Sequence, residues 1–200
     1  MSRLVAVSQR VAIDPATGER RDALDQRWGP FLQACGLTAL PLPNHADQAM
    51  ALVAEVTLAG VVLSGGNDLA AYGGNAPERD ETERRLVAWA RQHRLPVLGV
   101  CRGAQHLAHL LGGRLERING HAGTRHPLLP SGREVNSYHC FAIAELPAGI
   151  DVSARAADGG IESFRLSGEN VTAIMWHPER EDPPSPEDIA LFQSLFGAAA

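Results

Sequence analysis

A cysteine between two glycines is the feature with the clearest chemical potential. Residues 99–103 read Gly-Val-Cys-Arg-Gly, with an apolar run before them and a helix-forming segment after them. A sharp strand-to-helix turn holds such a side chain up at the carboxyl end of a sheet. The positive end of the helix dipole there favours the thiolate form. Cys101 is therefore a candidate nucleophile, and a buried structural cysteine beside packing glycines is the alternative.

A histidine and a glutamate two residues apart could supply the matching base. Residues 175–179 read Met-Trp-His-Pro-Glu and follow a predicted strand. Residues two apart in an extended chain face the same side, and Pro178 disfavours helical geometry at His177. His177 could thus act as a general base with Glu179 fixing its tautomer. The alternative is a loop that leaves both side chains on the surface.

Two further segments carry polar groups suited to a substrate. Gly65 and Gly66 follow a buried apolar run, and a glycine turn can aim backbone N–H groups at a ligand. One such N–H, with that of Arg102 after the cysteine, would form an oxyanion hole. An ordinary Gly-Gly turn is the alternative.

The segment 135–140 is the second of these. We expect its polar residues, Asn136, Ser137, Tyr138 and His139, to line a substrate pocket, with a packing or surface role as the alternative for His139. Cys140 is expected to be a small buried residue.

Short β-branched runs alternate with helical patterns along the chain, which predicts one α/β domain over residues 1–200 with a mostly parallel sheet. Residues 114–170 are rich in strands and turns and have no clear helical pattern. The expected strands cover residues 4–8, 37–42, 60–64, 96–100 and 171–175, and the expected helices cover residues 25–35, 47–58, 80–94, 102–111 and 186–196.

Composition excludes several classes of function. All 18 basic residues are arginines, so chemistry that needs a lysine amine, such as a Schiff base, is ruled out. A net charge of −5 argues against a nucleic-acid partner. No run approaches the length of a membrane span, and the first residues do not resemble a signal peptide. We therefore expect a cytoplasmic protein with no membrane partner.

The cysteines and histidines suggest neither a disulfide framework nor a metal. Three cysteines, at positions 35, 101 and 140, are few and widely spaced. His106 and His109 share a predicted helix, and His121 and His126 share a predicted loop. Neither pair has a cysteine or carboxylate set at a recognised ligand spacing. We expect no metal and no organic cofactor.

The motifs together resemble the class I glutamine amidotransferases, and within them the γ-glutamyl hydrolase branch, peptidase family C26. The resemblance spans roughly residues 4–196. It rests on Gly-Val-Cys-Arg-Gly-Ala-Gln at 99–105, His-Pro-Glu at 177–179, Gly-Gly-Asn-Asp at 65–68, Arg-Asp-Glu-Thr-Glu at 79–83 and Val-Asn-Ser-Tyr-His at 135–139. It implies a flavodoxin-like three-layer sandwich around a central, mostly parallel sheet.

The resemblance also implies roles for individual residues. Cys101 matches the nucleophile, His177 the base and Glu179 the residue that orients it, and the reaction passes through a γ-glutamyl thioester without a cofactor. The amides of Gly65, Gly66 and Arg102 match the oxyanion hole. Gln105 and the backbone of Ser137 and Tyr138 match the region that holds the glutamyl α-amino and α-carboxylate groups. The chain departs from the branch at Cys140 and Phe141, where His-Gln is usual.

A finer resemblance concerns residues 8–11, 18–25 and 41–44. They look like a bacterial sub-branch that removes a γ-glutamyl group from a CDP-linked phosphoramidate in capsule biosynthesis. Arg10 and Asn67 then become further substrate-binding candidates. Forked arginine side chains suit a pyrophosphate, and surface pairs with Glu19, Asp22 and Asp25 are the alternative. The arginines concerned are Arg10, Arg20, Arg21, Arg27 and Arg125.

We predict a hydrolase that cleaves the γ-glutamyl amide bond of a small molecule and releases glutamate. One alternative is a glutaminase subunit that delivers ammonia to a partner synthase, because it would use the same three residues. Another is a non-catalytic binding protein on the same fold. A homodimer is compatible with the sequence.

Overall fold

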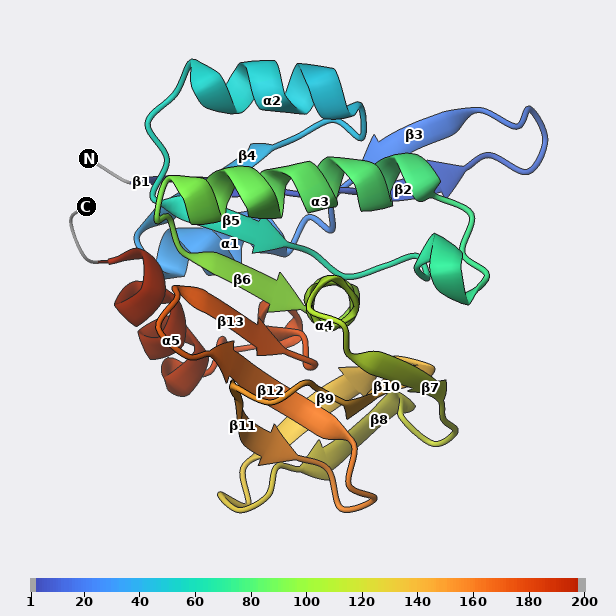
Figure 1. The fold of residues 1–200 in the computed structure, drawn as a ribbon, viewed down its shortest axis with the longest axis vertical. Helices are drawn as coiled ribbons and strands as arrows, with labels where there is room; N and C mark the ends of the chain where they lie inside the picture. Colours follow the sequence, from blue (N-terminus) through green and yellow to red (C-terminus); the bar gives the residue numbers. More distant parts are fainter. Residues whose placement is uncertain (1–2, 198–200) are drawn as a thin grey trace.

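The computed structural model describes residues 3–197 around one large sheet (Figure 1). Its strands lie in the order β4-β1-β5-β6-β13-β12-β10-β7, and β11 pairs with β12. The first five of these pair in parallel and the others antiparallel. Numbered among themselves, the parallel strands follow the order 2-1-3-4-5 of flavodoxin-like folds, which confirms the predicted fold. The parallel strands are β1 (Arg3–Val7), β4 (Leu37–Pro41), β5 (Gly60–Leu63), β6 (Val97–Val100) and β13 (Val171–Ile174).

Helices cover both faces of the parallel part. Alternate strand residues point to opposite faces, so Val61 and Leu63 join one buried cluster while Val62 joins the other. The first cluster includes residues of α2, α3 and α4, and the second includes residues of α1 and α5. The result is the predicted three-layer sandwich. The helices are α1 (Trp28–Ala34), α2 (Ala46–Ala54), α3 (Pro77–Gln92), α4 (Arg102–Leu110) and α5 (Pro186–Phe196).

Each predicted helix is present, and the differences lie at the ends. α3 begins at Pro77 rather than Asp80, because proline at the first helical position loses no hydrogen bond. α1 begins at Trp28 rather than Asp25, after a turn in which the Trp28 N–H donates to the Asp25 carbonyl. Within residues 3–197, no helix has the length and apolar character that crossing a membrane requires.

Residues 114–170 form strands and turns, as predicted, and the strands pair antiparallel. Four of these strands extend the main sheet, and β8 and β9 form a hairpin of their own. A second small hairpin, β2 with β3, follows β1. Their bounds are β2 (Arg10–Ile13), β3 (Arg20–Ala23), β7 (Arg114–Arg117), β8 (Ala122–Pro127), β9 (Glu134–Tyr138), β10 (Phe141–Glu145), β11 (Ile150–Arg155) and β12 (Ile161–Leu166), with short 3-10 helices η1 (Ala70–Tyr72) and η2 (Pro178–Arg180).

The carboxyl ends of the parallel strands bring the chemical motifs to one edge. Gly65 follows β5, Cys101 follows β6 and His177 follows β13, and these three strands are neighbours. Parallel strands end on the same side of a sheet, and in open α/β sheets ligands bind outside these carboxyl ends. The fold therefore gathers motifs that lie more than a hundred residues apart.

Candidate active site

Cys101 occupies a strained turn between β6 and α4. Its backbone has φ of +52° and ψ of −105°, a conformation that non-glycine residues rarely adopt. A Cβ atom on Gly103 would lie 2.1 Å from the Leu63 carbonyl oxygen, and one on Gly99 would lie 2.6 Å from the Gly103 backbone. Only glycine allows α4 to pack this closely on β5 and β6, which is the steric reason for the motif.

His177 is held from two sides. Its Nδ1 lies 2.7 Å from Glu179 Oε1, and because a carboxylate only accepts, Nδ1 carries the proton of the neutral ring. The Asn136 side chain accepts from the His177 N–H and donates to its carbonyl, both at 2.8 Å. His177 and Glu179 are both buried. The ring is thereby fixed with Nε2 as its free nitrogen.

Cys101 and His177 stabilise each other in charged form. Burial raises the pKa of Cys101, but the charge of His177 and a hydrogen bond with it outweigh burial, so the pKa falls below its ordinary value. Burial lowers the pKa of His177. The Cys101 thiolate and the Glu179 carboxylate have the larger, opposite effect and raise this pKa from 6.5 to about 10. Both shifts favour a thiolate–imidazolium pair. His139 also lowers the pKa of Cys101.

The glycine turn packs directly beneath the imidazole. A Cβ on Gly65 would lie 2.5 Å from His177 Cε1, so a side chain at this position would displace the ring. The buried Arg79 guanidinium donates to the carbonyls of Ser64 at 2.7 Å and of Gly65 at 3.1 Å, and also to that of Gly66. In a trans peptide the N–H points opposite to the carbonyl. The N–H groups of Gly65 and Gly66 therefore point away from Arg79.

Behind this turn, Glu83 forms a buried charged cluster. Its carboxylate accepts from Ser8 Oγ at 2.7 Å and from Arg79 Nε at 2.9 Å, contacts His106 Nδ1 at 2.8 Å and pairs with Arg102. Burial raises the pKa of Glu83, but Arg102 and Arg79 hold it well below its usual range. The Arg102 side chain is thus engaged by Glu83 and Asp80. Its backbone N–H, in the first turn of α4, is the group that can serve an oxyanion.

A cleft of about 570 Å³ opens above Cys101 and His177. Its lining includes two of the residues predicted for the oxyanion hole, Gly66 and Arg102, and most of those predicted to bind substrate: Arg10, Asn67, Gln105, Tyr138 and His139. Two predicted residues lie elsewhere. Asn136 is behind His177, whose backbone it holds, and Ser137 is fully buried. Gly65 lines an adjoining pocket with His177 and Glu179.

Several side chains in this region have settled partners. Asn67 is bonded through its side chain to the N–H and carbonyl of Val11, at 2.8 and 2.9 Å. Gln105 Nε2 donates to the Phe141 carbonyl at 2.9 Å. Among the arginines considered for a pyrophosphate, Arg20 pairs with Glu78, Arg21 with Glu19 and Arg125 with Glu181. Arg10 is the one that lines the cleft.

The expectation for Cys140 was wrong: its side chain is exposed and lines the cleft. Residues alternate here, so that Tyr138 and Cys140 face outward while His139 faces inward. Sequence reasoning also missed Arg180, whose guanidinium stacks over the Tyr138 ring at 4.5 Å. Its position directly after Glu179 was the available signal. All three cysteines are free.

The chain is similar to known proteins over most of its length. Residues 32–196 match the family model for glutamine amidotransferase class I. The chain belongs to the class I glutamine amidotransferases. It is 32% identical over 184 residues to the γ-glutamyl-CDP-amidate hydrolase of Campylobacter jejuni, covering 89% of this chain and 90% of that protein.

The chain is also similar to part of a longer protein and to a solved structure. The carbamoyl phosphate synthase small chain of Xylella fastidiosa is 31% identical over 82% of this chain, which spans only 42% of that protein. A solved structure from Thermoplasma acidophilum, provisionally described as part of a GMP synthase, has a TM-score of 0.73 at 21% identity. It covers 98% of this chain and 93% of its own, and it supports the fold alone.

The coupled ionisation predicts the pH profile of any Cys101-dependent activity. We expect a bell-shaped kcat/KM, because thiolate is lost on the acid side and the His177 proton is lost on the alkaline side. The acid limb should lie below the ordinary cysteine pKa of 9.0 and the alkaline limb near 10. Since Glu179 raises the His177 pKa, Glu179→Gln should move the alkaline limb to lower pH. An alkaline limb that stays in place would contradict this electrostatic role.

The Glu83 cluster predicts a large loss of stability on neutralisation. Glu83→Gln keeps the shape but leaves buried arginines uncompensated, which should lower the free energy of unfolding by about 3–5 kcal/mol. Urea denaturation measures this change. Glu169→Gln is the matched control, because it removes a half-exposed pair with Arg91 and should cost at most about 1 kcal/mol. Equal losses for the two variants would show that the cluster adds no special stability.

Proposed function

We propose that the protein hydrolyses γ-glutamyl amides through Cys101. The observation that carries this proposal is the pairing of a cysteine of lowered pKa with a histidine fixed by Glu179, at the floor of an open cleft. The similarity to the Campylobacter γ-glutamyl-CDP-amidate hydrolase over nine-tenths of both chains supports the same reaction class.

In the proposed mechanism the thiolate of Cys101 attacks the γ-carbonyl carbon of the substrate. The resulting oxyanion accepts hydrogen bonds from the backbone N–H groups of Gly66 and Arg102, each donor contributing roughly 3 kcal/mol. His177 then protonates the leaving nitrogen as the C–N bond breaks. A γ-glutamyl thioester remains on the sulfur, and water, deprotonated by His177, releases glutamate and restores the thiol.

The cleft offers groups for both parts of such a substrate. Gln105 uses its Nε2 on the Phe141 carbonyl, and we assign its Oε1 to the glutamyl α-ammonium. For the leaving group, Arg10 lies over Gly66, where a Cβ would come within 3.2 Å of the Arg10 Cβ. Arg180 lines the same cleft and stacks on Tyr138. Two guanidinium groups beside one cleft suit an anionic leaving group, and a γ-glutamyl-CDP-phosphoramidate has that chemistry.

A direct test is glutamate release from a panel of substrates. The panel holds glutamine, γ-glutamyl-γ-aminobutyrate, other γ-glutamyl amines and a γ-glutamyl-CDP-phosphoramidate. Rapid cleavage of the last is expected, and Cys101→Ala should lower turnover by at least a factor of about a thousand because the nucleophile is lost. Turnover that survives in Cys101→Ala would reject the mechanism. Weak activity on glutamine alone would instead favour a glutaminase subunit of a synthase; the Xylella relative is by name the small chain of a synthase.

Arg10 should determine affinity for an anionic leaving group. Arg10→Ala should raise KM for the CDP-phosphoramidate roughly 10- to 100-fold, since a hydrogen bond to a charged group contributes about 1.5–3 kcal/mol. Glutamine hydrolysis should change little. Arg20→Ala is the control because Arg20 pairs with Glu78 on the surface. If Arg10→Ala affected both substrates equally, Arg10 would have no role in leaving-group recognition.

A further inference from the structure

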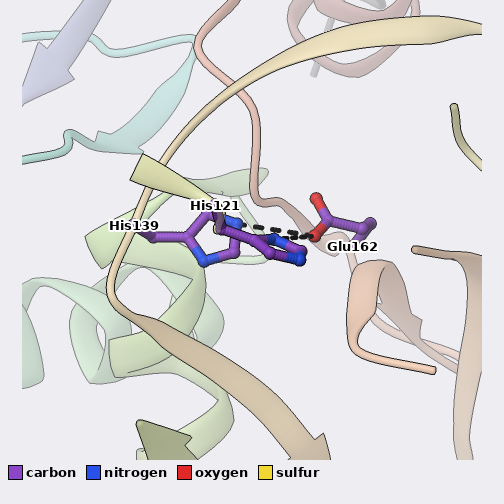
Figure 2. Close-up of side chains that lie close together, drawn as sticks. All are labelled: His121, His139 and Glu162. Carbon is purple, nitrogen blue, oxygen red and sulfur yellow. Dashed lines mark ion pairs between the residues drawn. The ribbon is translucent and has the colours of Figure 1, made fainter. Parts of the chain in front are cut away.

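Three histidines converge on one buried glutamate beside the cleft. His121 precedes β8, His126 lies in β8, His139 follows β9 and Glu162 lies in β12. Figure 2 shows the His121 and His139 rings directed at the Glu162 carboxylate. Glu162 Oε1 lies 3.4 Å from His126 Nε2, 3.4 Å from His139 Nε2 and 3.7 Å from His121 Nδ1. The sequence pattern had shown only the His121 and His126 pair, because the other two residues are distant in the chain.

Within the described residues 3–197, the atoms that face one another here have no hydrogen-bond partners. His121 Nδ1, His126 Nε2 and His139 Nε2, which face Glu162 Oε1, are buried without a hydrogen-bond partner, and so is the other carboxylate oxygen, Glu162 Oε2. His121, His139 and Glu162 are at least nine-tenths buried. Buried polar atoms without a hydrogen-bond partner are costly and rare. A cation held between His121, His139 and Glu162 would satisfy the two ring nitrogens that face the carboxylate.

The outer hydrogen bonds fix which nitrogen atoms have lone pairs. His139 Nδ1 lies 3.0 Å from the Phe141 carbonyl, and His121 Nε2 lies 3.0 Å from Asp158 Oδ2. Both partners are acceptors, so these nitrogens carry the protons. When the rings are neutral, the opposite nitrogens have lone pairs, which a cation beside the Glu162 carboxylate would accept. Metal-binding histidines characteristically donate their second N–H to a carboxylate or a backbone carbonyl.

The spacing also suits a metal better than hydrogen bonds. Donor atoms at tetrahedral positions about 2.0–2.1 Å from a zinc ion are roughly 3.3–3.4 Å apart. The separations from Glu162 Oε1, 3.4 to 3.7 Å, are close to that edge length. One ligand atom from each of His121, His139 and Glu162 lies within 4.8 Å of the other two. Imidazole nitrogens with one carboxylate oxygen form a donor set typical of Zn²⁺.

We propose that His121, His139 and Glu162 bind one Zn²⁺ ion, which leaves the fourth tetrahedral position to a water molecule. All three ligands are buried, so the ion would lie inside the protein rather than on its surface. It would join the β8–β9 hairpin to β12 in the main sheet. His139 also lines the cleft and interacts with Cys101, so the ion would fix the cleft wall nearest the sulfur.

Metal content and affinity test the proposal independently of turnover. The full chain is prepared with Cys101→Ala and Cys140→Ala, which removes both cleft thiols as competing ligands, then stripped with chelator and titrated with Zn²⁺. We expect one tightly bound equivalent, a rise in Tm on binding and, with Co²⁺ in its place, a tetrahedral visible spectrum lacking thiolate bands. No stoichiometric binding, or binding without a rise in Tm, would overturn the proposal.

Variants locate the ion. Glu162→Gln and His121→Gln should each weaken Zn²⁺ binding at least 100-fold, and Asp158→Asn, which alters an outer partner, should weaken it about 10- to 100-fold. His93→Gln is the matched control, because His93 is exposed and bonded to the Trp89 carbonyl. Circular dichroism of each apo form establishes that the variants fold. Unchanged affinity in folded Glu162→Gln would assign the zinc to another place and overturn the proposal.

Discussion

The buried carboxylate of Glu83 holds together the segments on which the site depends. It accepts from Ser8 after β1 and from Arg79 one turn earlier in α3, and it contacts Arg102 and His106 in α4. One negative charge between two buried guanidinium groups is stable only with all partners in place, because a missing partner leaves a buried charge uncompensated. The arrangement therefore selects one relative position of β1, α3 and α4.

That constraint reaches the reacting atoms through the backbone. Arg79 holds the carbonyls of the glycine turn, and Arg102 holds the start of the helix that follows Cys101. The unfavourable φ of Cys101 persists only where the surroundings determine it fully. The close approach of Gly103 to Leu63 and the ion pair of Arg102 with Glu83 hold the backbone of Cys101 in this conformation. The buried charged side chains behind the sheet edge thus position uncharged groups, the backbone amides of the glycine turn and of the first turn of α4.

Local patterns predicted the parts of the site that are local in sequence. Cys101 is defined by its flanking glycines, and His177 with Glu179 by a two-residue spacing, so each could be identified from a few residues. In the segment around His139, the alternation of inward and outward side chains could have predicted that Cys140 is exposed, although cysteine as a residue type is usually buried. Contacts that depend on topology could not be found this way. Glu162 meets His121 only because β12 lies beside the hairpin that carries the histidines, and no spacing records that.

The departure at residues 140 and 141 is tolerated for a related reason. The Phe141 carbonyl accepts from Gln105 Nε2 at 2.9 Å and from His139 Nδ1 at 3.0 Å. Both bonds are made to the main chain, so they are independent of which side chain stands at that position. One backbone oxygen therefore orients the residue that we assign to the glutamyl group and the histidine that faces both Cys101 and Glu162. The side chain of Cys140 lines the cleft and can vary with the leaving group, whereas that of Phe141 is fixed in the core, and the carbonyl keeps the shared geometry.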